Sequence, residues 1–214
     1  MWMEWTIPIQ KLEVNKIQVG QVQKTAKPLT PLSYADGPIV FQNLNLLLPP
    51  LLIKDYDVST GKLILSLSES PATLSKLLAL QESLLTSVFL NQRTWFSESA
   101  RTREQIQSCF QPFVENSSLY LYCPLQNQEK RHTIHIWKDG EWKRLAATGL
   151  LQKGDSIRVA MRLQGISFQM NASNGLWTGR CRVQHKISCI YQFIKPVNPE
   201  VIAIKQRVVE EQKC

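Results

Sequence analysis

Two stretches near the end of the chain, SIRVAMRL (residues 156–163) and GRCRVQHKISCI (residues 179–190), decide how this sequence is interpreted. Apolar and basic or small residues alternate in the first, which is typical of a strand with one buried face. Its apolar positions are Ile157, Val159, Met161 and Leu163, and the basic ones are Arg158 and Arg162. The second alternates in the same way, with one face formed by Arg180, Arg182, Gln184 and Lys186 and the other by Cys181, Val183, His185 and Ile187. The sequence therefore predicts two strands that are apolar on one face and basic on the other.

A third strand segment and a loop lie between these stretches. The segment GISFQM (residues 165–170) begins with a glycine, and a glycine inside a strand often indicates a bulge or a sharp bend. The polar residues 171–175 then predict a loop.

A β-hairpin is predicted just before them, in HTIHIWKDGEWKRL (residues 132–145). Asp139 and Gly140 form a two-residue turn that favours positive φ at both positions and fixes the register. We expect Lys138 to lie opposite Glu141, Trp137 opposite Trp142 and His135 opposite Arg144. Ile134, Ile136 and Leu145 are then expected on the other face.

The positive charge of the chain is concentrated in the same region. The 214 residues carry a net charge of +8, and residues 130–195 hold twelve basic residues but three acidic ones. Cations that follow a phosphate backbone, next to flat rings on which unpaired bases stack, are typical of single-stranded nucleic acid binding. The alternative is that basic residues on an outward β face keep the sheet soluble and protect its edges.

Two groups of candidate binding residues follow from this pattern. The main group contains Trp137, Lys138, Trp142, Lys143, Arg144, Arg158, Arg162, Phe168, Trp177, Arg180, Arg182 and Lys186. Among them Trp137, Trp142, Phe168 and Trp177 are the candidates for stacking. A secondary group at a helix junction contains Arg93, Trp95, Phe96, Arg101 and Arg103, for which the alternative is structural anchoring of two helices.

The remaining sequence predicts a mainly β, α+β fold. Strands are expected in residues 13–24, 39–48 and 120–125, and a hairpin in residues 56–67. Ser70 and Pro71 predict a helix start, and a second helix is expected from about Ser99 to Phe113. The predicted inward stripe of the first helix is Leu74, Leu77, Leu78, Leu84, Leu85 and Val88. We thus predict a single domain over residues 1–195 with a helical insertion at about 71–114, then a linker and a helix within residues 196–214.

Other classes of protein are disfavoured. The sequence contains no phosphate-binding glycine loop, H-E-x-x-H or G-x-S-x-G motif, so we expect neither an enzyme nor a cofactor. Five cysteines without a C-x-x-C pair predict reduced thiols in an intracellular protein rather than a zinc site. No metal is expected, because His132 and His135 would point to opposite faces of a strand. The opening residues do not look like a secretory signal, and the longest apolar run is too short to cross a bilayer, so no membrane partner is expected.

The layout also resembles a family of proteins of large eukaryotic DNA viruses that are similar to the single-stranded DNA-binding proteins of short-tailed bacteriophages. The resemblance spans residues 9–193 and rests on PIVFQNLNL (residues 38–46), Trp95-Phe96 followed by Thr102-Arg103-Glu104, and the block of residues 150–182 with its Lys-Gly-Asp turn. It implies an OB-like β-barrel with a helical insertion. In two places the chain departs from the family: Cys181 stands where a tryptophan is usual, and residues 196–214 are not acidic.

The leading hypothesis is a non-enzymatic protein that coats single-stranded DNA intermediates of viral replication, recombination or repair, with little sequence preference. The alternatives are a viral structural or assembly protein on the same scaffold and an RNA-binding protein. The location expected is intracellular, in the host nucleus or at a cytoplasmic viral replication site. The C-terminal helix is a candidate for contacts with a second copy of the chain or with replication proteins.

Overall fold

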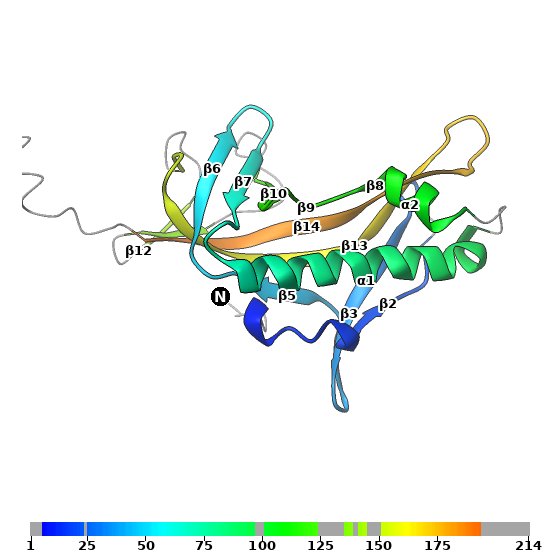
Figure 1. Cartoon of the computed structure of the whole chain (residues 1–214), viewed down its shortest axis with the longest axis horizontal. Helices are drawn as coiled ribbons and strands as arrows, with labels where there is room; N and C mark the ends of the chain where they lie inside the picture. Colours follow the sequence, from blue (N-terminus) through cyan, green and yellow to red (C-terminus); the bar gives the residue numbers. More distant parts are fainter. Residues whose placement is uncertain are drawn as a thin grey trace, which may run out of the picture.

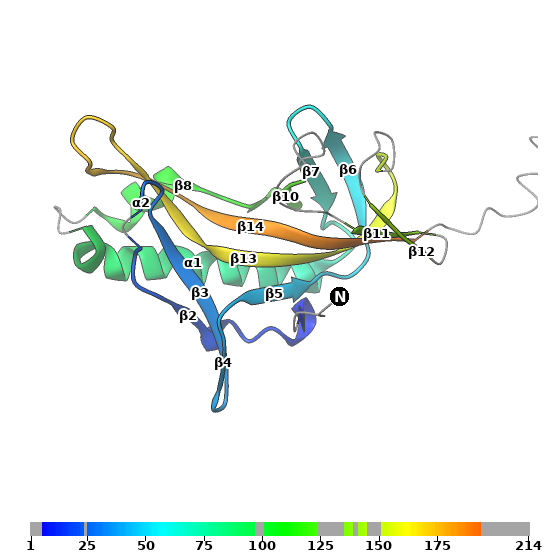
Figure 2. The same cartoon turned by 180° about the vertical axis from the view of Figure 1, so that it is seen from behind.

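A long antiparallel hairpin of two strands forms the spine of the molecule (Figures 1 and 2). The computed structural model describes residues 6–23, 25–96, 101–123, 135–138, 141–144 and 151–193. The spine consists of β13 (Ser156–Met170) and β14 (Trp177–Phe193). The two stretches that predicted strands thus belong to strands of 15 and 17 residues. The loop predicted at residues 171–175 connects them, as expected.

The other edge of β13 pairs with three strands in succession. Near its start it pairs with β6 (Leu51–Asp57), in its middle with β5 (Leu44–Leu47), and after Gly165 with β3 (Leu29–Asp36). Three short strands extend this side of the sheet: β1 (Ile7–Pro8) beside β5, and β2 (Ile17–Val19) and β4 (Ile39–Phe41) beside β3. A single long strand therefore organises most of the N-terminal half of the chain.

The edge of β14 that faces away from β13 also has several partners. Its first half pairs with β8 (Phe110–Gln111), and its second half with β11 (His135–Lys138), which forms a hairpin with β12 (Glu141–Arg144). Beyond β6, the sheet continues through β7 (Lys62–Ser66) and β10 (Ser118–Tyr122) to β9 (Val114–Glu115). The main path is thus β12-β11-β14-β13-β6-β7-β10-β9.

The described strands do not close into a barrel through backbone pairing. The path ends at β12 and β9, and no ladder joins β10 to β14 within the described residues. The two strands approach each other nevertheless, because the backbone N–H of Tyr122 donates a hydrogen bond of 2.8 Å to Nε2 of His185. The side chain of His185 thus links β10 to β14, two strands that would pair directly in a closed barrel.

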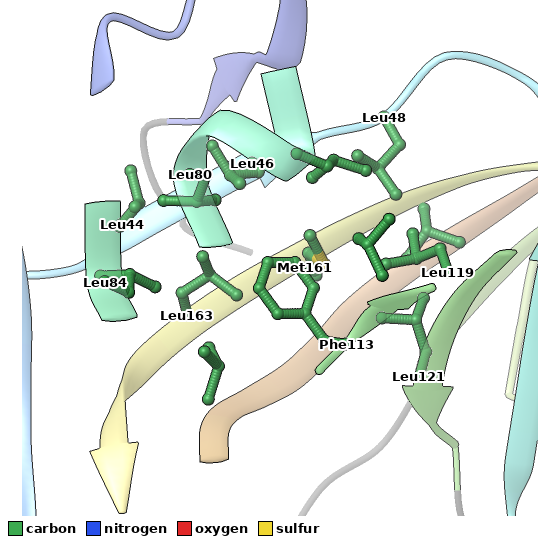
Figure 3. Packing of buried hydrophobic residues seen from close by; sticks show 14 of the residues in the cluster. Leu44, Leu46, Leu48, Leu80, Leu84, Phe113, Leu119, Leu121, Met161 and Leu163 are labelled. Atoms are coloured by element: carbon green, nitrogen blue, oxygen red, sulfur yellow. The ribbon is translucent and has the colours of Figure 1, made fainter. Parts of the chain in front are cut away.

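Helix α1 (Pro71–Phe96) covers the inner face of the spine (Figure 1). It begins at the predicted residue, and the carbonyl of Ser70 accepts the first helical hydrogen bond, from Leu74. Its buried stripe packs against leucines of β5 and against Met161 and Leu163 of β13 (Figure 3). The fully buried members of the stripe are Leu77, Leu80, Leu84 and Val88. Among the described residues, no helix combines the length and apolar character needed to span a membrane.

One residue of the predicted stripe does not belong to it. Leu78 is exposed, whereas Leu80, which the prediction omitted, is buried. Leu85, seven residues further on, lies on nearly the same side of the helix and is buried. The exposure of Leu78 therefore depends on what packs over this end of α1 and not on the helical period.

The second helix is shorter than the sequence predicts. α2 spans Arg103–Cys109, and the described residues 101–102 and 110–113 of the predicted range are not helical. It starts with a capping box, in which Thr102 and Gln105 exchange side-chain to backbone hydrogen bonds. It ends at Cys109 because Phe110 and Gln111 pair with β14 instead of continuing the helix. Two helices between β7 and β8, and a mainly β fold, are nevertheless confirmed for the described part of the chain.

Other boundaries differ in detail. A 3₁₀ turn at Val14–Lys16 replaces the start of the strand predicted at residues 13–24, and only Ile17–Val19 of it form a strand, β2. The strand predicted at residues 39–48 is divided into β4 and β5, which have different partners. The predicted hairpin in residues 56–67 is confirmed as β6 and β7. The linker and helix predicted in residues 196–214 lie outside the described residues.

Gly165 is the point at which the spine changes partners. The register of β13 and β14 shifts between Leu163 and Gly165, which confirms the predicted bulge. A Cβ atom at Gly165 would lie 2.1 Å from the carbonyl oxygen of Thr30 on β3. Since no side chain fits at that distance, glycine is required for β3 to cross this close to the spine.

Candidate nucleic-acid interface

The register of the spine brings the predicted cations of both strands to one face. Arg162 lies opposite Lys186, and Ser167 lies opposite Arg182, while the alternate pair of Ile166 and Val183 is buried. Residues that are opposite each other in a ladder point to the same side of the sheet. The resulting basic face, on the side of the spine away from the core, consists of Arg158, Arg162, Arg180, Arg182 and Lys186. The predicted alternation is thus confirmed, and neither β13 nor β14 contains an Asp or Glu residue.

Two of these arginines are held by neighbouring polar groups. In the amide orientation that satisfies both of its neighbours, Gln184 Oε1 accepts hydrogen bonds from Ser167 Oγ at 2.8 Å and Arg182 Nε at 3.0 Å. Arg162 donates through Nη2 to Oδ1 of Asn43, in the turn between β4 and β5. These contacts position the guanidinium groups without neutralising them, because both acceptors are uncharged amides.

A hollow of about 810 Å³ lies over the first half of β14 and the end of β13. Three cationic side chains line it, and the lining contains no acidic residue: they are Arg180 and Arg182 from the basic face and Lys27 from the segment before β3. Polar donors and acceptors such as Gln111 and Gln169 complete the lining. We call this the basic hollow. Its charge favours an anionic ligand.

A second hollow, of about 740 Å³, adjoins the first and shares Gln111, Arg182 and Gln184 with it. Its far side is formed by β7 and β10, with Lys62, Tyr120 and Tyr122. We call this the tyrosine hollow. Shared lining residues mean that the two hollows form one continuous depression across β14, from Lys27 to Tyr122.

The predicted tryptophan hairpin lies at the other end of β14. Its register is confirmed: Lys138 pairs with Glu141, Trp137 with Trp142, and His135 with Arg144. β11 runs parallel to the end of β14, with Trp137 opposite Tyr191. The side chains of Trp137, Lys138, Trp142, Lys143 and Arg144 lie outside the described part of the structure, as does the predicted face of Ile134 and Leu145, so their binding role stays a prediction.

Phe168 and Trp177 do not occupy the position expected of stacking residues. They are 5% and 3% exposed, and they pack with Trp95 and Phe96 at the end of α1. The ring of Trp177 stacks on that of Phe96 at a centroid distance of 4.8 Å, and Arg101 covers it from another side at 5.1 Å. A ring must expose a face to stack on a base, so this placement does not support the expected role of Phe168 and Trp177.

The secondary group supports the structural alternative for the same reason. Trp95, Phe96 and Arg101 belong to this aromatic cluster, and Arg101 Nη2 also donates to the carbonyl of Trp177 at 2.7 Å. Arg103 forms an ion pair with Glu82 of α1 and therefore ties the two helices together. Arg93 alone among them is exposed. Trp95, Phe96 and Arg101 thus anchor the end of α1 against the spine.

Two titratable groups in the linings of the hollows, Cys181 and His185, have pKa values shifted by burial. Burial raises the pKa of the Cys181 thiol to about 12, so it is protonated at neutral pH. Burial also lowers the pKa of His185 to about 4, which keeps the ring neutral and able to accept the hydrogen bond from Tyr122. Within the described residues, no three His, Cys, Asp or Glu side chains are grouped as metal ligands.

Four residues of the hollows were not predicted from the sequence pattern: Lys27, Lys62, Tyr120 and Tyr122. The alternation in SLYLY (residues 118–122) was a usable signal, because it puts both tyrosines on the face opposite Leu119 and Leu121. Their proximity to the basic face depends on the pairing of β10 with β7 and on the approach of β10 to β14, which the sequence does not show.

Comparisons with protein-family models, with curated proteins and with solved structures find no match for this chain.

Proposed function

We propose that this protein binds single-stranded DNA with little sequence preference and acts as a non-enzymatic coat on intermediates of viral DNA replication, recombination or repair. The observation that carries the proposal is the basic face: it has five cations on two paired strands that contain no acidic residue, and two of them, Arg180 and Arg182, line an acid-free hollow. Cations that contact phosphates supply affinity but carry no sequence information, which is the pattern expected of a general binder.

The proposed fold is OB-like. Strands β14, β13, β6, β7 and β10 follow one another in the sheet, and the Tyr122–His185 hydrogen bond joins the last to the first. The two helices enter between β7 and β8, where the resemblance places an insertion. OB folds bind single strands across an exposed strand face that carries cations and aromatic rings.

A salt titration tests the proposal. For single strands, the logarithm of the binding constant falls by about 0.7 per phosphate contact for each tenfold rise in salt. Five contacts therefore predict that the affinity for fluorescent oligothymidine, measured by anisotropy, falls about 100-fold between about 50 and 200 mM salt. An affinity that changes less than about threefold over this range would overturn the proposal.

Variants locate the interface. Arg180→Ala combined with Arg182→Ala should reduce the slope by about 1.4, because two phosphate contacts are lost. The charge-matched control is Lys11→Ala combined with Lys153→Ala, since both residues are exposed and neither lines the hollows. An equal loss in both double variants would show that net charge, and not the basic face, causes binding.

Competition separates the related functions. Unlabelled single-stranded DNA should displace the probe at lower concentration than duplex DNA of equal length. Equal competition by duplex would favour an assembly protein that binds any polyanion, and stronger competition by RNA would favour an RNA-binding protein.

A further inference from the structure

We infer that the tyrosine hollow is a base-stacking site, in which Tyr122 and Tyr120 each hold one splayed base of a single strand whose phosphates follow the basic hollow. The inference rests on the proposed function, because it names the side chains that would bind the bases of the same ligand. Four observations support it.

The first observation is the exposure of Tyr122. Its side chain is 57% exposed, although it belongs to a strand whose neighbouring residue, Leu121, is buried. Within the described residues, no hydrogen bond is made by the hydroxyl group of Tyr122 or of Tyr120. A large ring on an outward face, not used for packing or hydrogen bonding, is available to a ligand.

The second observation is the rigid support of this ring. The backbone of Tyr122 pairs with Lys62 of β7 on one side, and on the other its N–H donates to His185 of β14. The ring therefore projects from a backbone that is fixed on both edges. Such a platform loses little conformational freedom when a base stacks on it.

The third observation is the charge next to the rings. The Lys62 ammonium group lies 5.5 Å from the centroid of the Tyr120 ring, and Arg182 is shared by both hollows. A strand that places its phosphates near Arg182 can reach Tyr122 with the attached base, because one depression contains both residues. Glu115 is the acidic residue in the lining of the tyrosine hollow, and the basic hollow has none.

The fourth observation is that both tyrosines stand on the same face of β10, two residues apart. The Cα atoms of such residues are about 6.7 Å apart, which is about twice the 3.4 Å between neighbouring bases along one strand of a duplex. Two bases that occupy the two rings must therefore be unstacked from each other. A flexible single strand adopts this arrangement, whereas a duplex does not.

Alanine substitution combined with an abasic oligonucleotide tests the inference. Tyr122→Ala should weaken binding of oligothymidine about tenfold, as expected for the loss of one stacked base. The salt dependence should be unchanged, because no phosphate contact is lost. Tyr122→Phe is the matched control: it keeps the ring and should bind like the wild type.

The abasic strand makes the result specific. When the oligonucleotide has a full set of phosphates but no bases, the wild type and Tyr122→Ala should bind with equal affinity. Crosslinking with bromodeoxyuridine and peptide mapping should identify the peptide of β10. If Tyr122→Ala binds oligothymidine like the wild type, or if it weakens binding of the abasic strand equally, the inference is wrong.

The outcomes also separate the two proposals. Salt-dependent binding that Arg180→Ala with Arg182→Ala weakens, but that Tyr122→Ala leaves unchanged, would overturn the stacking site and leave the proposed function intact. Absence of salt-dependent binding in the wild type would overturn both.

Discussion

The two faces of the β13–β14 spine belong to the same strands but have different chemistry. On the inner face, Ile157, Val159 and Leu163 are buried in the core, which also contains the leucines of α1 and β5. On the outer face, arginines and Lys186 line up without an acidic neighbour on either strand. Because neighbouring residues of a strand point in opposite directions, one backbone supports the core and carries the proposed interface. Substitutions on the inner face should therefore affect stability, and those on the outer face should affect binding.

The largest effect is expected where α1 covers the inner face. Leu84→Ala removes a fully buried side chain and should lower the free energy of unfolding by about 3 to 5 kcal/mol. Leu90→Ala, on the same helix but 70% exposed, is the control and should change it by less than about 0.5 kcal/mol. Urea unfolding measures both. A similar loss in the two variants would mean that the helix does not bury the leucines as described.

The next effect concerns the crossing of the spine by β3. Gly165→Ala places a methyl group against the backbone of Thr30, and backbone cannot move aside as a side chain can. We expect a loss of about 3 kcal/mol in the free energy of unfolding, as for an overpacked core. Gln164→Ala, at the neighbouring exposed position, should be nearly neutral. An equally stable Gly165→Ala would contradict the close approach of β3.

His185 is a polar residue on the otherwise apolar inner face of β14, and its protonation should make stability depend on pH. The pKa of His185 is lowered to about 4 by burial, so between about pH 6.5 and 4 the unfolded chain binds a proton that the folded chain does not. The contribution of His185 to the free energy of unfolding should therefore be complete above about pH 6.5. It should fall by about 2 to 3 kcal/mol as the pH decreases to 4.

Comparison with His185→Asn isolates this contribution, since the carboxylates titrate equally in both proteins. Urea unfolding at pH 7 and pH 4.5 should show a smaller decrease in the variant. Parallel decreases would indicate that His185 is not buried as a neutral ring.

The smallest effect on stability is expected on the outer face. Lys186→Ala removes one of two cations that lie opposite each other, and should change the free energy of unfolding by less than about 0.5 kcal/mol. Its effect should appear in binding, as a decrease of about 0.7 in the salt slope for oligothymidine. A large loss of stability with an unchanged slope would remove the distinction between the two faces.

The sequence predicted what local patterns determine. Period-two alternation identified the face of Arg180 and Arg182, and the Asp139-Gly140 turn predicted the register of Trp137 with Trp142. Phe168 could not be placed in the same way, because Trp95 and Phe96, which cover it, are some 70 residues away in the chain. Tyr122 likewise becomes a candidate only when β10 is brought to β14. The face of a strand on which a side chain lies is therefore determined by local sequence. The residues that cover or leave open that face are determined by the pairing of distant strands and helices.

The order in which the strands pair has a consequence for how the chain folds. β5 and β3 find their partner in β13, and the hydrogen bond between Asn43 and Arg162 joins residues 119 positions apart. A ribosome that adds about 10 residues per second needs roughly ten seconds to make the chain between them. During this interval the N-terminal strands have apolar surfaces and unpaired edges, and pairings of such high contact order form slowly. Synthesis of the basic hairpin is therefore the event that lets the whole sheet assemble, and truncation before residue 156 should leave an aggregation-prone chain rather than a smaller folded domain.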